Sequence, residues 1–190
     1  MVPVLRDQKG KSMAPLLKPS ECSVLVLDSA GEPSVHHADV IAGRDRILQA
    51  ASLCGIPSFL AVRDRTEVAA HGASPKSSDQ HIFSPPMPGN SWAETPLGLA
   101  LARASRNSLL ICGYWLDECI TFTALNALGE GYDIYLVTDA SPPLDADHRH
   151  ISILRLVQAG VVPTTARQVV REWAGEIPDA DQRAQLLALL

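Results

Sequence analysis

Cys119 and Asp28 are the two residues whose types and positions best suit nucleophilic chemistry. Cys119 follows a short apolar run, residues 108–113, and stands where a helix is expected to begin. The N-terminus of a helix stabilises a thiolate through its dipole and its free N–H groups. Asp28 closes another apolar run, residues 22–27. If both runs are parallel strands, the two side chains lie at the carboxyl edge of one sheet, where such sheets bind ligands.

Both residues also have simpler interpretations. Cysteine is among the most buried residue types, and a cysteine on an apolar helix usually belongs to the core. A carboxylate after a strand commonly caps a helix or closes a turn, so the position of Asp28 alone leaves its role open. The other three cysteines, Cys22, Cys54 and Cys112, show no C-x-x-C spacing. This usage predicts free thiols in a reducing compartment, with no zinc site and no disulfide framework.

The elements that position Cys119 form one strand–helix–strand unit. The apolar run 108–113 predicts a buried strand, and apolar residues at helical spacing predict a helix over 121–128. Residues 132–138 form the second apolar run. Because such crossovers are right-handed, the two strands are expected to be parallel.

The rest of the chain continues the alternation of strands and helices. Further strands are expected at 22–27, 57–62, 81–83 and 161–163, and helices at 40–53, 95–103, 148–157, 166–173 and 184–190. This order predicts the α/β class, as a three-layer, doubly wound parallel sheet of about six strands. Residues 1–19 are expected to form an N-terminal arm, and residues 20–190 a single domain.

Charge and hydropathy exclude several classes of partner. The formal net charge of the 190-residue chain is −5, which argues against a nucleic-acid partner. No apolar run approaches the length of a membrane-spanning helix, and the N-terminus lacks the apolar core of a secretory signal. We therefore expect a cytoplasmic protein that binds a small-molecule substrate, without a membrane partner.

The sequence around Cys119, G-Y-W-L-D-E-C-I-T-F-T-A followed by A-L-G-E-G-Y-D-I-Y-L-V-T-D-A, resembles the isochorismatase-like cysteine hydrolases. This superfamily includes nicotinamidases, isochorismatases and N-carbamoylsarcosine amidohydrolases. The matching residues are Gly113, Cys119, Ile120, Thr123, Ala124, Gly131, Val137, Asp139 and Ala140. The resemblance covers roughly residues 18–175 and is greatest to the hydrolase branch that has no assigned substrate. It implies a sheet order of 3-2-1-4-5-6 and assembly as a homo-oligomer.

The resemblance also implies roles for individual residues. Asp28 would be the general base that takes the proton of Cys119, and the thiolate would attack a carbonyl carbon. The peptide bond between Tyr114 and Trp115 would be cis. The backbone N–H groups of Trp115 and Cys119 would form the oxyanion hole.

The sequence departs from the family at its third catalytic residue, a Lys or Arg near the third strand. Three alignments place Ser84, Pro85 or Met87 at this position, and none of these is basic. Three basic residues could replace the cation from the tip of the second strand or the loop after it, namely Arg63, Arg65 and Lys76. Without a cation, the charges of Asp28 and of ionised Cys119 would repel each other.

Two functions therefore remain open. The first is hydrolysis of a small amide, or of a related C–N or ester bond, through a Cys119 thioester. The second is a small-molecule-binding or scaffold protein that has lost turnover together with the cation. The metal-binding branch of the nicotinamidases needs an Asp and two His after the second strand, where only His71 occurs, so we expect no metal and no other cofactor.

Overall fold

Six parallel strands form the central sheet of the computed structural model, which describes residues 16–29, 38–63, 82–84 and 92–190. The strand order is β3-β2-β1-β4-β5-β6, as the resemblance predicts. The strands are β1 (Cys22–Ser29), β2 (Ser58–Arg63), β3 (Ile82–Phe83), β4 (Ser108–Gly113), β5 (Asp133–Val137) and β6 (Val162–Thr164). Every neighbouring pair is parallel, so all six strands end at the same edge.

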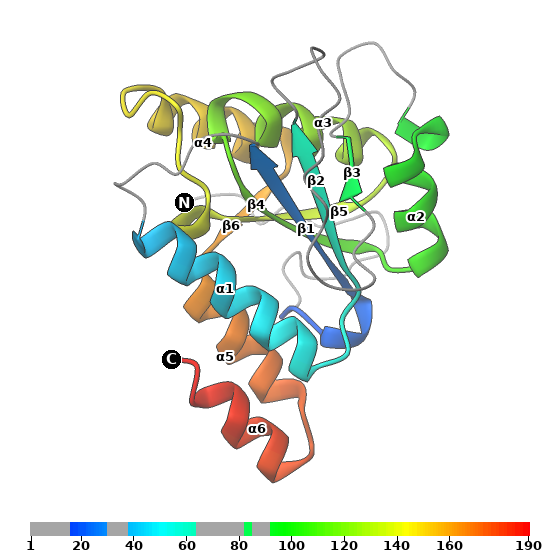
Figure 1. Cartoon of the computed structure of the whole chain (residues 1–190), viewed down its shortest axis with the longest axis vertical. Coiled ribbons are helices and arrows are strands. Elements are labelled where there is room, and N and C mark those ends of the chain that lie inside the picture. Colours follow the sequence, from blue (N-terminus) through cyan, green and yellow to red (C-terminus); the bar gives the residue numbers. More distant parts are fainter. Residues whose placement is uncertain (1–15, 30–37, 64–81, 85–91) are drawn as a thin grey trace, which may run out of the picture.

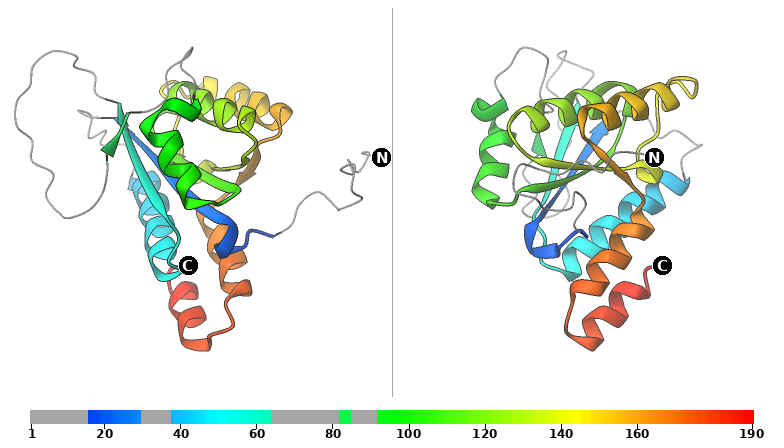
Figure 2. Two further views of the ribbon diagram at one scale, coloured as in Figure 1. Left: turned by 90° about the vertical axis from the view of Figure 1, so that its right-hand side faces the viewer. Right: turned by 180° about the vertical axis from the view of Figure 1, so that it is seen from behind.

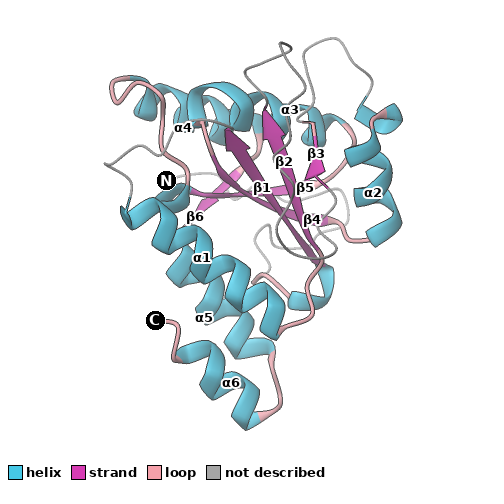
Figure 3. Ribbon diagram, viewed as in Figure 1, coloured by secondary structure: helices cyan, strands magenta, loops and turns pink. Residues whose placement is uncertain are grey.

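Helices cover both faces of the sheet and complete a three-layer α/β/α structure (Figures 1 and 3). One face carries α1 (Ala38–Leu53), α5 (Ala166–Glu176) and α6 (Ala180–Leu187). The other carries α2 (Pro96–Ala104), α3 (Thr121–Gly129) and α4 (His148–Ala159). The side and rear views in Figure 2 show α1, α5 and α6 together, away from α3 and α4. Among the described residues, no helix has the length and apolar character needed to cross a membrane.

The side chains of β1 contribute alternately to two parts of the core, one on each face of the sheet, because successive side chains of a strand point to opposite faces. Val24 and Val26 belong to the core under α1 and α5, which is centred on Trp173. Leu25 and Leu27 belong to the core under α2, α3 and α4. All four side chains are buried, as expected for a parallel strand that is covered on both faces.

Side-chain caps fix where several helices begin. The Thr95 hydroxyl accepts a hydrogen bond of 3.0 Å from the Gly98 N–H at the start of α2, in agreement with the predicted cap. The predicted start of the terminal helix at residue 184 is wrong. Asp179 accepts a bond of 2.7 Å from the Gln182 N–H, and α6 begins at Ala180.

The end of the predicted N-terminal arm packs against the domain. Leu17 is buried, and its N–H donates a hydrogen bond of 2.9 Å to Glu172 Oε2 of α5. Residues 1–15 of the arm lie outside the described residues.

The closest approach between β1 and β4 occurs at Gly113. This residue pairs with Leu27, and the N–H of Tyr114 then donates a hydrogen bond of 2.8 Å to the Leu27 carbonyl. Gly113 has a φ of 116°, and a Cβ at this position would overlap the Leu27 carbonyl oxygen. Only glycine satisfies both the backbone angle and the contact.

We predict that Gly113→Ala lowers the free energy of unfolding by about 3 kcal/mol or more, because it adds a backbone clash to a strained φ. Gly160→Ala is the matched control, since Gly160 has a φ of 110° and an added Cβ there would meet nothing within 4 Å. The control should lose only about 1–2 kcal/mol, the ordinary cost of a left-handed residue. Urea unfolding of both variants measures the difference, and equal losses would show that the Leu27 contact is unimportant.

Candidate active site

Cys119 lies in a π-helical turn, Leu116–Ile120, that connects β4 to α3. Several hydrogen bonds close the turn: the Thr121 hydroxyl donates to the Leu116 carbonyl, and the N–H groups of Ile120 and Glu118 donate to the Trp115 carbonyl at 3.1 and 3.2 Å. The Cys119 side chain is half-buried and packs against the edge of the core under α3. The thiol therefore lies at the border between the apolar core and the carboxyl edge of the sheet.

The peptide bond between Tyr114 and Trp115 is cis, and it is the bond that the family resemblance singles out. The two aromatic rings lie edge to face, with their centroids 4.9 Å apart. Burial raises the pKa of the Tyr114 phenol; the Arg44 charge opposes this effect and the Asp28 charge adds to it. Tyr114 therefore lies within electrostatic reach of both charged residues.

Asp28 lies near the carboxyl end of β1 and forms an ion pair with Arg44 of α1. Arg44 Nη1 is 3.6 Å from Asp28 Oδ2, and the two side chains are 24% and 37% exposed. Arg44 Nε also lies 3.5 Å from Asp45 Oδ1. Arg44 is not among the cations predicted from the sequence, because those positions lie near the second and third strands. One signal was present: a helix that follows the first strand runs back over the sheet, so its first turns lie beside the carboxyl edge.

A cavity of about 180 Å³ adjoins this ion pair between α1 and the strands β1 and β2. Asp28 and Arg44 form its polar wall. The remaining lining residues are Val26, Leu48, Ser58, Phe59 and Leu60.

Of the three positions predicted for the family cation, the structure describes only Ser84. Ser84 follows β3 and is exposed, and β3 lies two strands from β1, or about 10 Å at the usual strand spacing. A serine side chain cannot cover that distance. Arg63 is the last residue of β2 and pairs with Ser29. The remaining candidates, Pro85, Met87, Arg65 and Lys76, lie outside the described residues.

Asp117 connects two segments by hydrogen bonds, the turn that contains Cys119 and the loop before α4. Its carboxylate accepts hydrogen bonds of 2.8 Å from the Leu144 N–H and 3.2 Å from the Asp145 N–H. His148 Nδ1 lies 3.4 Å from the same carboxylate. Burial opposes ionisation of Asp117, but the two N–H donors and His148 outweigh it and lower the pKa of this carboxyl.

The turn after β5, Thr138–Ala140, is bonded to the start of α4 and to the start of α5. The Arg149 guanidinium donates hydrogen bonds to the carbonyls of Thr138 at 2.7 Å and Ser141 at 3.2 Å. Asp139 accepts a bond of 2.8 Å from the Ala166 N–H at the start of α5. Asp139, one of the residues that carry the family resemblance, therefore caps a helix in this structure.

The other cysteines lie in surroundings that disfavour a thiolate. Burial raises the pKa of Cys22 to about 12 and that of Cys112 to about 12. Burial also raises the pKa of Cys54. Within the described residues, no group of three or more His, Cys, Asp and Glu side chains is arranged to hold a metal ion, while His71 lies outside them.

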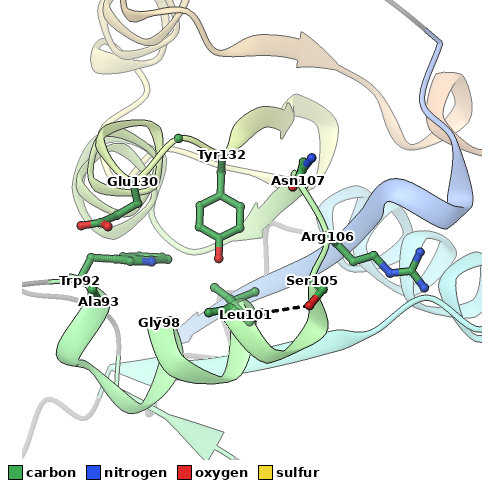
Figure 4. Close-up of a pocket in the computed structure, with 11 residues that line it drawn as sticks. Trp92, Ala93, Gly98, Leu101, Ser105, Arg106, Asn107, Glu130 and Tyr132 are labelled. Carbon is green, nitrogen blue, oxygen red and sulfur yellow. Dashed lines mark hydrogen bonds between the residues drawn. The ribbon is translucent and has the colours of Figure 1, made fainter.

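A second cavity, of about 320 Å³, lies at the opposite end of the sheet. Its walls are the start and end of α2, the turn before β4 and the turn before β5. Figure 4 shows Trp92 and Tyr132 above α2 in this cavity, with Arg106 directed away from it. Because Cys119 follows the carboxyl end of β4, this cavity is separate from the site of Cys119 and Asp28.

Comparisons with known proteins agree with this geometry. The isochorismatase domain model matches residues 32–168. The probable hydrolase YcaC of Escherichia coli is 34% identical over 92 residues, which are 46% of this chain and 44% of that protein. Isochorismatase domain-containing protein 2 of Bos taurus is 25% identical over 149 residues, which are 75% of this chain and 69% of that protein. In sequence, the matched segment thus spans less than half the length of the E. coli relative.

Solved structures show the same fold. The E. coli YcaC structure, described as an octameric hydrolase of unknown specificity, has a TM-score of 0.70 at 22% identity and covers 94% of this chain and 92% of its own. YcaC from Pseudomonas aeruginosa, solved with hexane-2,5-diol and covalent acrylamide, has a TM-score of 0.67 at 21% identity. It covers 91% of this chain and 90% of its own.

We predict that Asp117→Asn destabilises the protein by about 1–2 kcal/mol at neutral pH, because an amide satisfies only one of the two N–H donors. The folded-state pKa of Asp117 is lower than its unfolded value of about 4. Its stabilisation is therefore complete above about pH 4 and is lost as the pH falls through the folded-state value. The difference from wild type should shrink below about pH 4.

Chemical unfolding across this pH range measures the effect. Asp147→Asn is the matched control, because Asp147 is exposed in the same loop and its side chain makes no capping hydrogen bond. Equal stability of wild type and Asp117→Asn at pH 7 would contradict the role of Asp117.

The four thiols should differ in their reactivity toward an alkylating reagent. Brief treatment with iodoacetamide near pH 8 should modify Cys119 before the other cysteines. A thiol with a pKa of about 12, as for Cys22 and Cys112, is ionised to only about one part in ten thousand at this pH. Peptide mass spectrometry gives the order of modification, and earlier labelling of Cys54 would contradict the prediction.

Proposed function

Because the chain belongs to the isochorismatase family, we propose that it is a cysteine hydrolase acting on a small amide, or on a related C–N or ester bond. The observation that carries this proposal is the pairing of β1 with β4, which directs Asp28 and the turn with Cys119 toward one edge of the sheet. The names of the curated relatives agree with a hydrolase.

The proposed reaction has two stages. Asp28 takes the proton of the Cys119 thiol, and the sulfur forms a bond to the carbonyl carbon of the substrate. The N–H groups of Trp115 and Cys119 would stabilise the negative oxygen of the tetrahedral intermediate. The C–N bond then breaks, the departing amine takes the proton from Asp28, and a thioester remains on Cys119.

Water completes the cycle. Asp28 takes a proton from water, and the hydroxide that forms attacks the thioester carbonyl. The C–S bond breaks, the acid leaves, and the sulfur regains its proton from Asp28. Each group returns to its starting state, so the scheme needs no metal and no other cofactor.

A solved relative supports a site that admits a small amide. The structure of YcaC from P. aeruginosa contains covalent acrylamide, a molecule with a primary amide and only five non-hydrogen atoms. In this chain, the cavity of about 180 Å³ beside Asp28 suits a molecule of similar size.

We also propose that the protein acts in the cytoplasm as a homo-oligomer. The octameric structure of E. coli YcaC supports this assembly. In this chain α4 exposes Ile151, Leu154 and Val157, which recur at helical spacing and form an apolar stripe. Such a stripe suits a contact between subunits.

Hydrolysis should depend on Cys119. A panel of small primary amides, assayed by ammonia release, should yield at least one substrate, and Cys119→Ala should lower its turnover by about a thousandfold or more. Cys54→Ala is the control and should retain activity within about twofold, because Cys54 lies outside the site. Mass spectrometry of the quenched reaction should show an acyl group on Cys119.

Turnover by Cys119→Ala would contradict the thioester mechanism. An absence of both turnover and adducts across the panel would instead favour a small-molecule-binding or scaffold protein. The exposed Ser84 after β3 is the observation that keeps this second function open.

A further inference from the structure

We propose that Arg44 is the cation of this active site, supplied by α1 instead of the region after the third strand. In this role Arg44 holds the Asp28 carboxylate and compensates the negative charge that passes to Cys119 when its thiol ionises. The inference rests on the proposed hydrolase function and adds a positioning residue to it. It adds Arg44 to the candidates for the cation, which the sequence placed at Arg63, Arg65 and Lys76.

The first support is the contact itself. Arg44 Nη1 lies 3.6 Å from Asp28 Oδ2, and Arg44 and Asp28 both line the cavity of about 180 Å³. The charge of Arg44 also acts on Tyr114, whose carbonyl carbon belongs to the cis peptide bond that leads into the Cys119 turn. One guanidinium thus contacts the proposed base and acts electrostatically on the side chain of Tyr114, which precedes the Cys119 turn.

The second support is the way in which the fold fixes α1. Gly43 packs against the turn after β5, where an added Cβ would lie only 3.3 Å from both Ala140 Cβ and the Asp139 carbonyl oxygen. Near the C-terminus of the chain, Arg46 Nε donates a hydrogen bond of 2.7 Å to the Leu189 carbonyl. Arg44 lies between these two anchors, so its backbone has little freedom to move away from Asp28.

The third support is the charge balance of the proton transfer. Before transfer, the site contains cationic Arg44, anionic Asp28 and a neutral thiol. After transfer, it contains cationic Arg44, a neutral carboxyl and an anionic sulfur on Cys119. The summed charge of these three groups is zero in both states, and Asp45, which contacts Arg44, adds a negative charge that does not change. Without Arg44 these negative charges would be uncompensated throughout.

In the part of the chain that the structure describes, the other charged and titratable groups found around the pair are acidic or neutral. Asp45, which contacts Arg44, and Asp139, which acts on Cys112, are both acidic. The pKa of Cys112 is raised to about 12 by burial, and that of Tyr114 is also raised by burial, so both stay neutral near pH 7. Among these described groups, Arg44 supplies the positive charge.

The test measures the rate at which iodoacetamide alkylates Cys119 between pH 5.5 and 9, followed by peptide mass spectrometry. Arg44→Gln should slow alkylation at pH 7 by about tenfold and move the rise in rate toward alkaline pH. Arg44→Lys should retain the wild-type profile within about threefold, because it keeps the charge. Arg183→Gln on α6 is the control for loss of one exposed arginine and should leave the profile unchanged.

A double-mutant cycle tests whether Arg44 acts through Asp28. In an Asp28→Asn background, Arg44→Gln should slow alkylation at pH 7 less than it does in the wild type, because the carboxylate that Arg44 holds is gone and only its direct effect on the thiolate remains. The double variant also removes the ion pair without leaving an unpaired carboxylate at position 28, so it remains informative if Arg44→Gln alone unfolds.

Two outcomes would overturn the proposal: equal profiles for wild type and Arg44→Gln, or an equal loss in Arg44→Lys and Arg44→Gln. Because alkylation needs no substrate, these outcomes are independent of hydrolysis. A protein that shows the predicted alkylation profiles but no turnover would refute the proposed function and leave the role of Arg44 intact.

Discussion

The close approach of Gly113 to the Leu27 carbonyl is the constraint on which the site depends. Because no side chain fits between these strands, β1 and β4 pair closely up to Leu27 and Gly113. At the next residue of each segment the pairing ends: Asp28 continues β1 beside β2 and contacts Arg44 of α1, and Tyr114 begins the turn that leads to Cys119. A packing requirement in the core thus sets the level in the sheet at which the candidate base and the turn with the nucleophile are presented.

The ion pair between Asp28 and Arg44 adds little to the stability of the fold, so its importance lies in the chemistry of the proposed site. Its atoms are 3.6 Å apart and both side chains are partly exposed, and such pairs contribute between zero and about 1 kcal/mol to folding. A partly exposed pair beside a cavity can still orient a carboxylate and can respond when a proton or a substrate arrives. The weak stabilisation is consistent with a place in a site that must change its charge distribution during a reaction.

Local patterns in the sequence predicted most of the fold. Strand β4 has the predicted bounds, since its apolar run is bordered by polar Asn107 and ends at Gly113. The Thr95 cap and the turn at Cys119 also follow from residues that are neighbours in sequence. Such features depend on backbone geometry and burial, which a short window of sequence specifies.

Contacts between distant segments could not be predicted in this way. Arg44 and Asp28 are brought together by the path of α1 over the sheet, and Asp117 meets Leu144 only when α4 has packed beside α3. The start of α6 was misplaced because Asp179 and the residues after it are polar, and the periodicity of apolar residues does not reveal a polar first turn. These are the features that tertiary packing decides.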